Sequence, residues 1–81
     1  MDQVRKEKIL KLFGLHLKDL RNKRNISLRV LEQIADVDYS QIHRIEKGET
    51  APSLLTMIAI AEGLGITLAE LVNFSIDAEI S

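Results

Sequence analysis

The sequence predicts an all-α domain of five helices, and three features of the 81-residue chain support this fold class. Apolar residues recur at steps of three and four through residues 2–24, which contain no proline. Residues 27–48 have the pattern of two short helices joined by a tight turn. Residues 53–74 contain two further apolar stretches, and each follows a side chain that favours the first turn of a helix.

Length and composition limit the kind of protein that this chain forms. With 81 residues it makes one domain, whose small core is marginal unless the helices pack efficiently or a partner helps. It contains no cysteine, which excludes disulfides, a thiolate nucleophile and a cysteine-based zinc site. No apolar run approaches the roughly 18 residues of a membrane span, and the N-terminus lacks an apolar signal core. We therefore expect a soluble, cytoplasmic protein with no membrane partner.

Residues 2–24 should form a long first helix. The main apolar stripe of this helix consists of Leu10, Phe13, Leu17 and Leu20. Ile9, Leu12 and Leu15 lie off the stripe, either as a second surface, such as a dimer contact, or as ordinary exposed apolar residues. Asn25 then tolerates the left-handed conformation that ends a helix.

The next two helices are short and closely spaced. Ser27 is suited to cap the first of them, whose apolar positions are Leu28, Leu31, Ile34 and Ala35. The pattern breaks at residues 36–38, where two Asp side chains can bond their own backbone and cap the second short helix. In that helix, Ile42 and Ile45 lie on one side, and the opposite side carries Ser40, His43, Arg44 and Lys47. Gly48 supplies the left-handed position after it.

The exposed side of this second short helix has the composition of a helix that lies in a DNA major groove. It is rich in hydrogen-bonding groups and carries no acid. An Arg can form two hydrogen bonds to guanine, a Gln can pair with adenine, and Ser and Tyr can reach bases or phosphates. We therefore expect base contacts from Tyr39, Ser40, Gln41, His43 and Arg44.

The C-terminal part of the chain should hold two more helices. After a loop that contains Pro52, Ser53 can cap a helix that is apolar almost all round and is therefore expected to be a buried central helix. Gly65 ends it. Residues 67–70 form a capping box, and the helix that they open carries Leu68, Leu71, Val72 and Phe74. Residues 75–81 have no strong period and should form a tail.

The net charge of −1 taken alone argues against nucleic-acid binding, but the charges are unevenly distributed. Residues 1–25 hold eight basic and three acidic side chains, and residues 26–50 hold three basic and five acidic ones. Residues 51–81 hold four acidic side chains and no basic one. This polarity is typical of a protein with a basic side towards DNA and an acidic far side, although solvated helix faces would give the same counts.

The segment LEQIADVDYSQIHRIEKGE, with its ending IHRIEKG, resembles the helix-turn-helix of phage-repressor and Cro proteins, also called XRE-type regulators. The resemblance covers roughly residues 13–72 and implies a compact five-helix, lambda-repressor-like fold. It divides the chain into an N-terminal helical extension of the first helix (1–12), a DNA-binding domain (13–74) and a C-terminal tail (75–81). The helix-turn-helix itself spans residues 27–48.

The resemblance also implies a structural ion pair. Glu46 sits too close to the core side of its helix to be simply solvated, and in the resembling family an Arg that matches Arg21 reaches it from the first helix. Two residues depart from the family pattern. Asp36 stands where the family usually has Gly, and Asp can take the left-handed conformation that this turn needs. Glu32 stands where the family usually has Ala, so either its carboxylate reaches solvent or the two short helices cross more widely than usual.

The function that the resemblance implies is sequence-specific regulation of transcription, as a repressor that inserts its third helix into the major groove of double-stranded DNA. Phosphate contacts are expected from residues that flank the groove: Ser27, Arg29, Lys47 and Ser53. One short helix reads too few base pairs to select an operator, so we expect a homodimer bound to an inverted repeat. The dimer contact is expected to consist of Leu68, Leu71, Val72, Phe74 and Ile76.

An enzyme is the least supported alternative, because His16 and His43 lie in different helices and no metal-binding spacing occurs. We expect no cofactor, no metal and no small-molecule ligand. A protein-interaction or antitoxin-like module on the same fold stays open, since fold does not decide function. The exposed side of the third helix discriminates between the two, because an interaction module does not need that side to be basic and free of acid.

Overall fold

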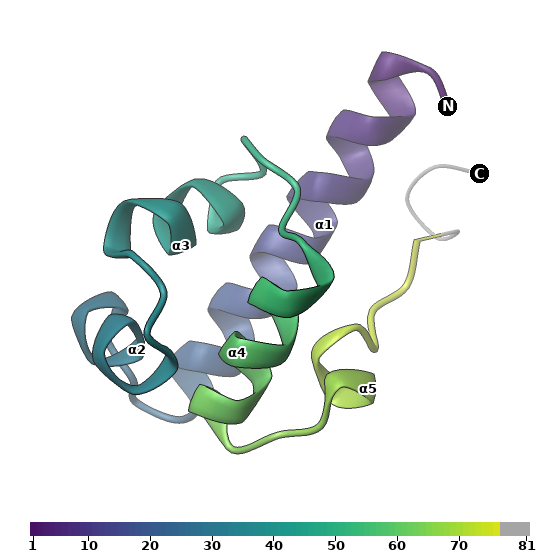
Figure 1. The fold of residues 1–81 in the computed structure, drawn as a ribbon. Helices are drawn as coiled ribbons and strands as arrows, with labels where there is room; N and C mark the ends of the chain where they lie inside the picture. Colours follow the sequence, from purple (N-terminus) through teal and green to yellow (C-terminus); the bar gives the residue numbers. More distant parts are fainter. Residues whose placement is uncertain (77–81) are drawn as a thin grey trace.

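Five helices make up the fold of the described part of the chain. The computed structural model describes residues 1–76, and Figure 1 shows how the helices are arranged. They are α1 (Gln3–Lys23), α2 (Leu28–Ala35), α3 (Tyr39–Glu46), α4 (Leu54–Leu64) and α5 (Leu68–Leu71). The part of the chain that the structure describes contains no strand, so the expected all-α class is confirmed. No helix in that part is long and apolar enough to cross a bilayer.

The helix ends follow local signals in the sequence. Four helices begin at a side chain that accepts a hydrogen bond from the backbone N–H three residues on: Asp2, Ser27, Ser53 and Thr67. Asn25 takes the left-handed conformation, with φ 54°, and the Ile26 N–H reaches back to the Arg21 carbonyl oxygen over 3.1 Å. This Schellman arrangement ends α1 with the carbonyl oxygens of Arg21 and Asn22 paired.

The apolar core draws side chains from all five helices. α2 packs on α4, α3 packs on α1 and α2, and α5 packs on α4 and α1. The largest fully buried side chains are Leu17, Leu31, Ile42, Ile45, Ile60 and Leu71. Burial of one such side chain contributes about 1.5–3 kcal/mol, so even the single turn of α5 is held in place by its Leu71.

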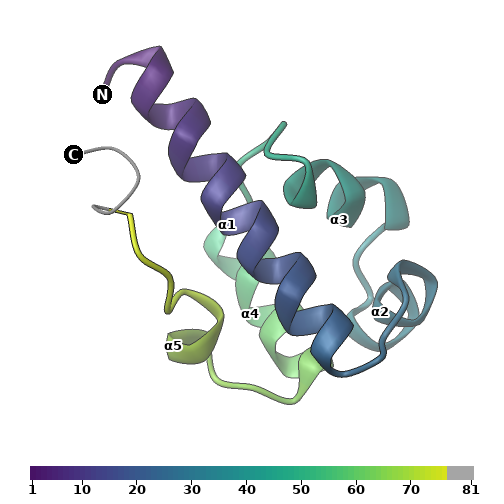
Figure 2. The ribbon, with the colours of Figure 1, turned by 180° about the vertical axis from the view of Figure 1, so that it is seen from behind.

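α3 approaches α1 closely because α1 has a glycine at the crossing. A Cβ atom on Gly14 would lie 2.4 Å from the carbonyl oxygen of Glu46 and 2.6 Å from that of Ile45, well inside van der Waals contact. The bare backbone at Gly14 therefore allows α1 to touch the last turn of α3. Figure 2 shows, from behind, that the N-terminal turns of α1 continue beyond this crossing and project past the other helices.

The expectation of a buried central helix is wrong. The composition of α4 predicts a buried central helix, but Leu54 and Leu55 in its first turn are 57% and 77% exposed. α2 and α5 cover parts of α4, and one side of the helix is left uncovered. Ile34 is likewise 50% exposed, because α2 buries the side that carries Leu31 and Ala35. A helix with apolar residues on every side does not reveal from its period which side faces out.

Several residues expected at a dimer contact are used inside the protomer. Leu71 has no exposed surface, so its assignment to a dimer contact is corrected: the side chain belongs to the core. α5 is shorter than expected, and Phe74 follows it and packs on Phe13 with 5.7 Å between the ring centroids. Val72 is 43% exposed. The remaining residues of the expected contact are partly buried: Leu68, Phe74 and Ile76. Residues 77–81 of the expected tail lie outside the described residues.

Candidate nucleic-acid interface

α3 turns one polar side to solvent. Its inner side buries Ile42 and Ile45, which are 0% and 1% exposed, against the neighbouring helices. The polar side, with the two half-buried residues at its borders, is called the α3 surface and consists of Tyr39, Ser40, Gln41, His43, Arg44 and Lys47. It contains no acidic residue, because the acid of the last turn, Glu46, is buried. All five residues expected to contact bases therefore lie together on this surface.

The turn before α3 depends on Asp36. The backbone of this residue has φ 55° and ψ 44°, the left-handed conformation expected where the resembling family usually has Gly. Val37 follows and is only 8% exposed, so it anchors the turn in the core. The chain changes direction within residues 36–38, and α3 starts directly afterwards at Tyr39.

Two carboxylates bind the first amides of α3. Asp38 accepts hydrogen bonds from the Ser40 N–H, over 3.0 Å, and from the Ser40 hydroxyl. The hydrogen bond from the Ser40 hydroxyl, helped by the backbone N–H groups of Ser40 and Gln41, holds the pKa of Asp38 below its usual value. Glu32, from α2, accepts the Tyr39 N–H over 2.8 Å. The N-terminus of α3 is therefore satisfied by protein groups and not left for a phosphate.

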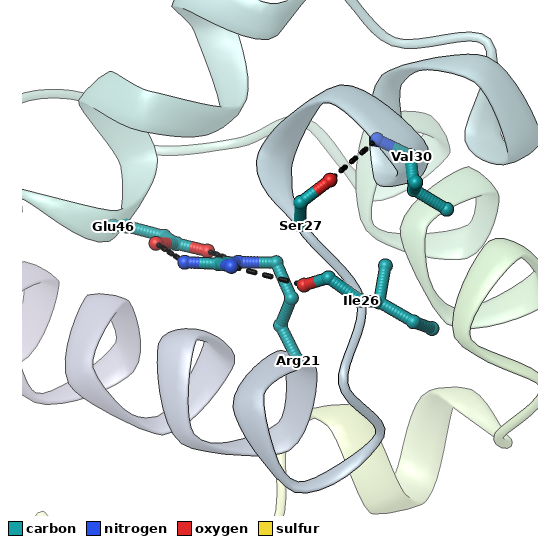
Figure 3. A network of polar contacts seen from close by, with 5 residues as sticks. All are labelled: Arg21, Ile26, Ser27, Val30 and Glu46. Carbon is teal, nitrogen blue, oxygen red and sulfur yellow. Dashed lines mark hydrogen bonds and ion pairs between the residues drawn. The ribbon is translucent and has the colours of Figure 1, made fainter.

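A buried ion pair ties the last turn of α3 to α1 (Figure 3). Arg21 Nε and Nη2 donate to the two carboxylate oxygens of Glu46 over 2.7 and 2.9 Å, and Nη1 donates to the Ile26 carbonyl oxygen over 3.0 Å. The two side chains are 9% and 4% exposed. The hydrogen bond to Glu46 raises the pKa of Arg21, so the guanidinium stays charged. The expected structural pair is thus present, and it also joins the segment that connects α1 to α2.

Two of the expected phosphate-binding residues are helix caps. The Ser27 hydroxyl accepts the Val30 N–H over 3.1 Å, as Figure 3 shows, and the Ser53 hydroxyl accepts the Thr56 N–H over the same distance. Both serines are exposed. The N-termini of α2 and α4 therefore combine a hydroxyl with the positive end of a helix dipole, which is the arrangement that favours an anion.

The other two expected phosphate-binding residues are cations beside the α3 surface. Lys47 follows α3 directly, and its Nζ lies 3.2 Å from a carboxylate oxygen of Glu49. The Lys47 side chain is 55% exposed, so this pair is weak and leaves the ammonium accessible. Arg29 is 73% exposed in its side chain, and its guanidinium carbon lies 4.2 Å from the centroid of the Tyr39 ring.

The sequence model of one protein family matches most of the residues that form this fold. The HTH_3 helix-turn-helix profile matches residues 17–71, which is more than half of the chain. The chain belongs to the HTH_3 helix-turn-helix family. Members of this family are DNA-binding transcriptional regulators of XRE type, not enzymes, and the family assignment made from the sequence is confirmed. No curated protein matches the chain.

Solved structures share the fold of this HTH_3 chain. The restriction-modification controller protein C.AhdI from Aeromonas hydrophila is 31% identical, and the match covers 76% of this chain and 94% of that chain with a TM-score of 0.74. An HTH_3 family transcriptional regulator from Vibrio cholerae is 30% identical over 80% of this chain and 37% of that chain, with a TM-score of 0.75. The clp gene regulator ClgR from Corynebacterium glutamicum shows the fold alone, at 21% identity over 78% and 67% of the two chains and a TM-score of 0.72.

Two residues that shape the α3 surface of this HTH_3 domain are missed by sequence reasoning about the site. Gly14 sets how closely α3 approaches α1, and the available signal is that it is a lone glycine inside a long helical pattern. Glu32 binds the first amide of α3, and its side chain is only 31% exposed instead of free in solvent. Its departure from the family's usual Ala draws attention to the position, but the contact to Tyr39 is visible only in three dimensions.

Proposed function

We propose that this HTH_3 protein is a sequence-specific transcriptional repressor that binds double-stranded DNA as a homodimer, with α3 in the major groove. The observation that carries the proposal is the α3 surface, which is accessible, rich in hydrogen-bond donors and free of acid. An α-helix fits the width of the major groove, and side chains of a recognition helix reach the base edges there. Arg44 and Gln41 supply the groups that pair with guanine and with adenine.

The proposed DNA contacts are of two kinds: contacts to bases, which read the sequence, and contacts to phosphates, which position the protein on the duplex. Base contacts are assigned to the α3 surface: Tyr39, Ser40, Gln41, His43 and Arg44. Phosphate contacts, which set the register of a protein on the duplex without reading sequence, are assigned to Ser27, Arg29, Lys47 and Ser53. The exposed first turns of α2 and α4 support this assignment because the N-terminal end of a helix dipole attracts an anion, and Lys47 supports it because it adds a positive charge directly after α3.

The replacement Arg44→Ala tests the assignment of base reading. DNA selected from a random pool by the purified protein defines the preferred site, and affinities for that site and its single-base variants are then measured. We expect Arg44→Ala to weaken binding to the preferred site by about 1–3 kcal/mol and to relax specificity at one base pair. Lys18→Ala removes the same charge from an exposed position on α1 and should leave the base preference unchanged. An equal loss on every sequence would make Arg44 a phosphate contact.

The proposed homodimer uses the uncovered apolar side of α4 together with α5. The exposed apolar residues of this proposed contact surface are Leu54, Leu55 and Val72. Residues 51–81 carry no basic side chain, so this end of the protein is repelled by DNA. A twofold axis near this end would let the α3 surfaces of both protomers face the same side of the DNA. The half-site centres would then lie about one helical turn apart, roughly 34 Å. The competing surface is the outer side of α1, where Val4 and Leu15 are each 63% exposed.

The repressor role is tested on a promoter that carries the selected inverted repeat. The similarity to a controller protein and to a transcriptional regulator supports a role in gene control. We expect the protein to lower reporter expression and Arg44→Ala to restore it. Raised expression would contradict repression without contradicting DNA binding. If the random pool yields no enriched sequence, DNA reading itself is wrong, and the protein-interaction or antitoxin-like alternative is favoured.

A further inference from the structure

Glu32 connects α2 with the first residue of α3. Its Oε2 accepts the Tyr39 N–H over 2.8 Å, and its Oε1 lies 3.6 Å from Arg29 Nη1. The Arg29 guanidinium carbon is 4.2 Å from the centroid of the Tyr39 ring, and the Tyr39 ring lies 6.1 Å from that of His43. One carboxylate thus contacts both the backbone of α3 and a cation that covers the first side chain of the α3 surface.

The Arg29 guanidinium is restrained from two directions. The carboxylate of Glu32, on the same helix α2, attracts the guanidinium, and the ring of Tyr39 on α3 provides a face on which guanidinium groups stack. An exposed ion pair by itself is weak, but here the same carboxylate is also fixed by its hydrogen bond to Tyr39. The Arg29 side chain remains 73% exposed, so donors that Glu32 does not use are available to DNA.

We propose that Glu32 is a positioning residue for DNA recognition, which holds the Arg29 guanidinium over Tyr39 so that Arg29 contacts DNA beside the N-terminal end of α3. This proposal rests on the proposed function of the α3 surface and adds a residue that acts through another one. A side chain held in its bound geometry loses less entropy on binding, so the restraint strengthens the Arg29 contact. N-terminal residues of a recognition helix are the ones that meet base edges, which places Arg29 next to them.

For removal of the Glu32 charge, the proposal predicts a change in DNA affinity opposite to the one that charge repulsion alone would give. A carboxylate beside DNA repels the phosphates, so its removal should by charge alone strengthen binding. If Glu32 holds Arg29 in position, its removal weakens binding instead. Glu32→Gln is the informative variant, because the amide oxygen still accepts the Tyr39 N–H while the charge that attracts Arg29 is gone.

The test is a double-mutant cycle on the DNA that the wild-type protein selects. Affinities are measured for wild type, Glu32→Gln, Arg29→Ala and the double variant. We expect Glu32→Gln to weaken binding by about 5- to 30-fold, and to have almost no further effect once Arg29 is alanine, because the two residues act as one unit. The matched control is Asp19→Asn, which removes the same charge from an exposed ion pair on α1 and should not weaken binding. The proposal is overturned if Glu32→Gln binds as tightly as wild type, or if its effect persists in the Arg29→Ala background.

A measurement without DNA separates this proposal from the proposed function. With the Arg29 guanidinium carbon 4.2 Å from the Tyr39 centroid, we expect the ring current of Tyr39 to shift the NMR signals of the Arg29 side chain in the free protein. Glu32→Gln should move these signals towards the values of an unrestrained arginine. Unchanged Arg29 signals would overturn the positioning role whatever the DNA result. If the wild type selects no DNA but the signals respond, the proposed function fails while the restraint on Arg29 stands. An equal loss of affinity on all sequences agrees with the phosphate contact assigned to Arg29 above, and a loss confined to one base pair would reassign that contact to a guanine; both support the positioning role.

Discussion

Replacing Arg21 by methionine should remove a large part of the stability of the domain. The guanidinium makes two hydrogen bonds to Glu46 and one to the Ile26 carbonyl oxygen, and the carboxylate that would remain is only 4% exposed. Breaking one partner out of a buried pair costs about 3–5 kcal/mol. At about 0.05–0.15 kcal/mol per residue, a domain of 81 residues has a free energy of unfolding of only about 4–12 kcal/mol. The expected loss is therefore at least about a quarter of the free energy of unfolding of the domain.

Urea denaturation followed by circular dichroism measures this effect. With a slope of about 1–3 kcal/mol/M, Arg21→Met should lower the midpoint by at least about 1 M, and Glu46→Leu should lower it similarly. The double variant leaves no unpaired charge in the core and should recover most of the loss. It should remain about 0.5–1.5 kcal/mol below wild type, because the Ile26 carbonyl oxygen has still lost its donor. Losses in the double variant equal to the sum of the single losses, or an unchanged midpoint for Arg21→Met, would refute the reasoning.

Three further predictions concern backbone contact, pH and assembly. Gly14→Ala should lower the free energy of unfolding by about 1–3 kcal/mol, despite the roughly 1 kcal/mol advantage of alanine in a helix, because its Cβ would lie 2.4 Å from the Glu46 carbonyl oxygen. Asp38→Asn should lower the melting temperature at pH 7, and the difference from wild type should narrow as the pH falls below 3.8. The reason is that the pKa of Asp38 is depressed in the folded state, so its contribution is present above that ordinary value and is lost in acid. Leu55→Asp should turn a dimer into a monomer in sedimentation, whereas Leu15→Asp should leave it a dimer.

Each of these predictions has a result that contradicts it. A Gly14→Ala protein as stable as wild type in urea would mean that α1 and α3 do not touch at this point. A melting difference for Asp38→Asn that is constant from pH 7 to pH 2 would show that charge plays no part in the cap. If Leu15→Asp is monomeric and Leu55→Asp is not, the dimer forms through α1. Leu71→Asp is no substitute in this experiment, because Leu71 is fully buried and its replacement would disrupt the protomer itself.

The order of the helices, most of their ends and the solvent side of α3 could be predicted from the sequence because these properties depend on neighbouring residues. A cap such as Ser27 bonds an amide only three residues away, and a left-handed residue such as Gly48 ends a helix wherever it stands. The helical period places Ile42 and Ile45 on one side of α3 without knowledge of what covers them. The Arg21 partner of Glu46 lies on another helix and came only from the family resemblance.

The sequence by itself therefore determined the local structure and whether each helix side is apolar or polar. The tertiary structure decided which of these sides are covered by other helices. Leu71 and Val72 are adjacent and similarly apolar, yet one is 0% and the other 43% exposed, because only one of them points at the neighbouring helices. Leu55 is exposed for the same reason on α4. The role of Glu32 depends on where the N-terminus of α3 lies relative to α2. Such relations are set by the packing of helices that are distant in the chain, and the period of a single helix carries no information about its neighbours.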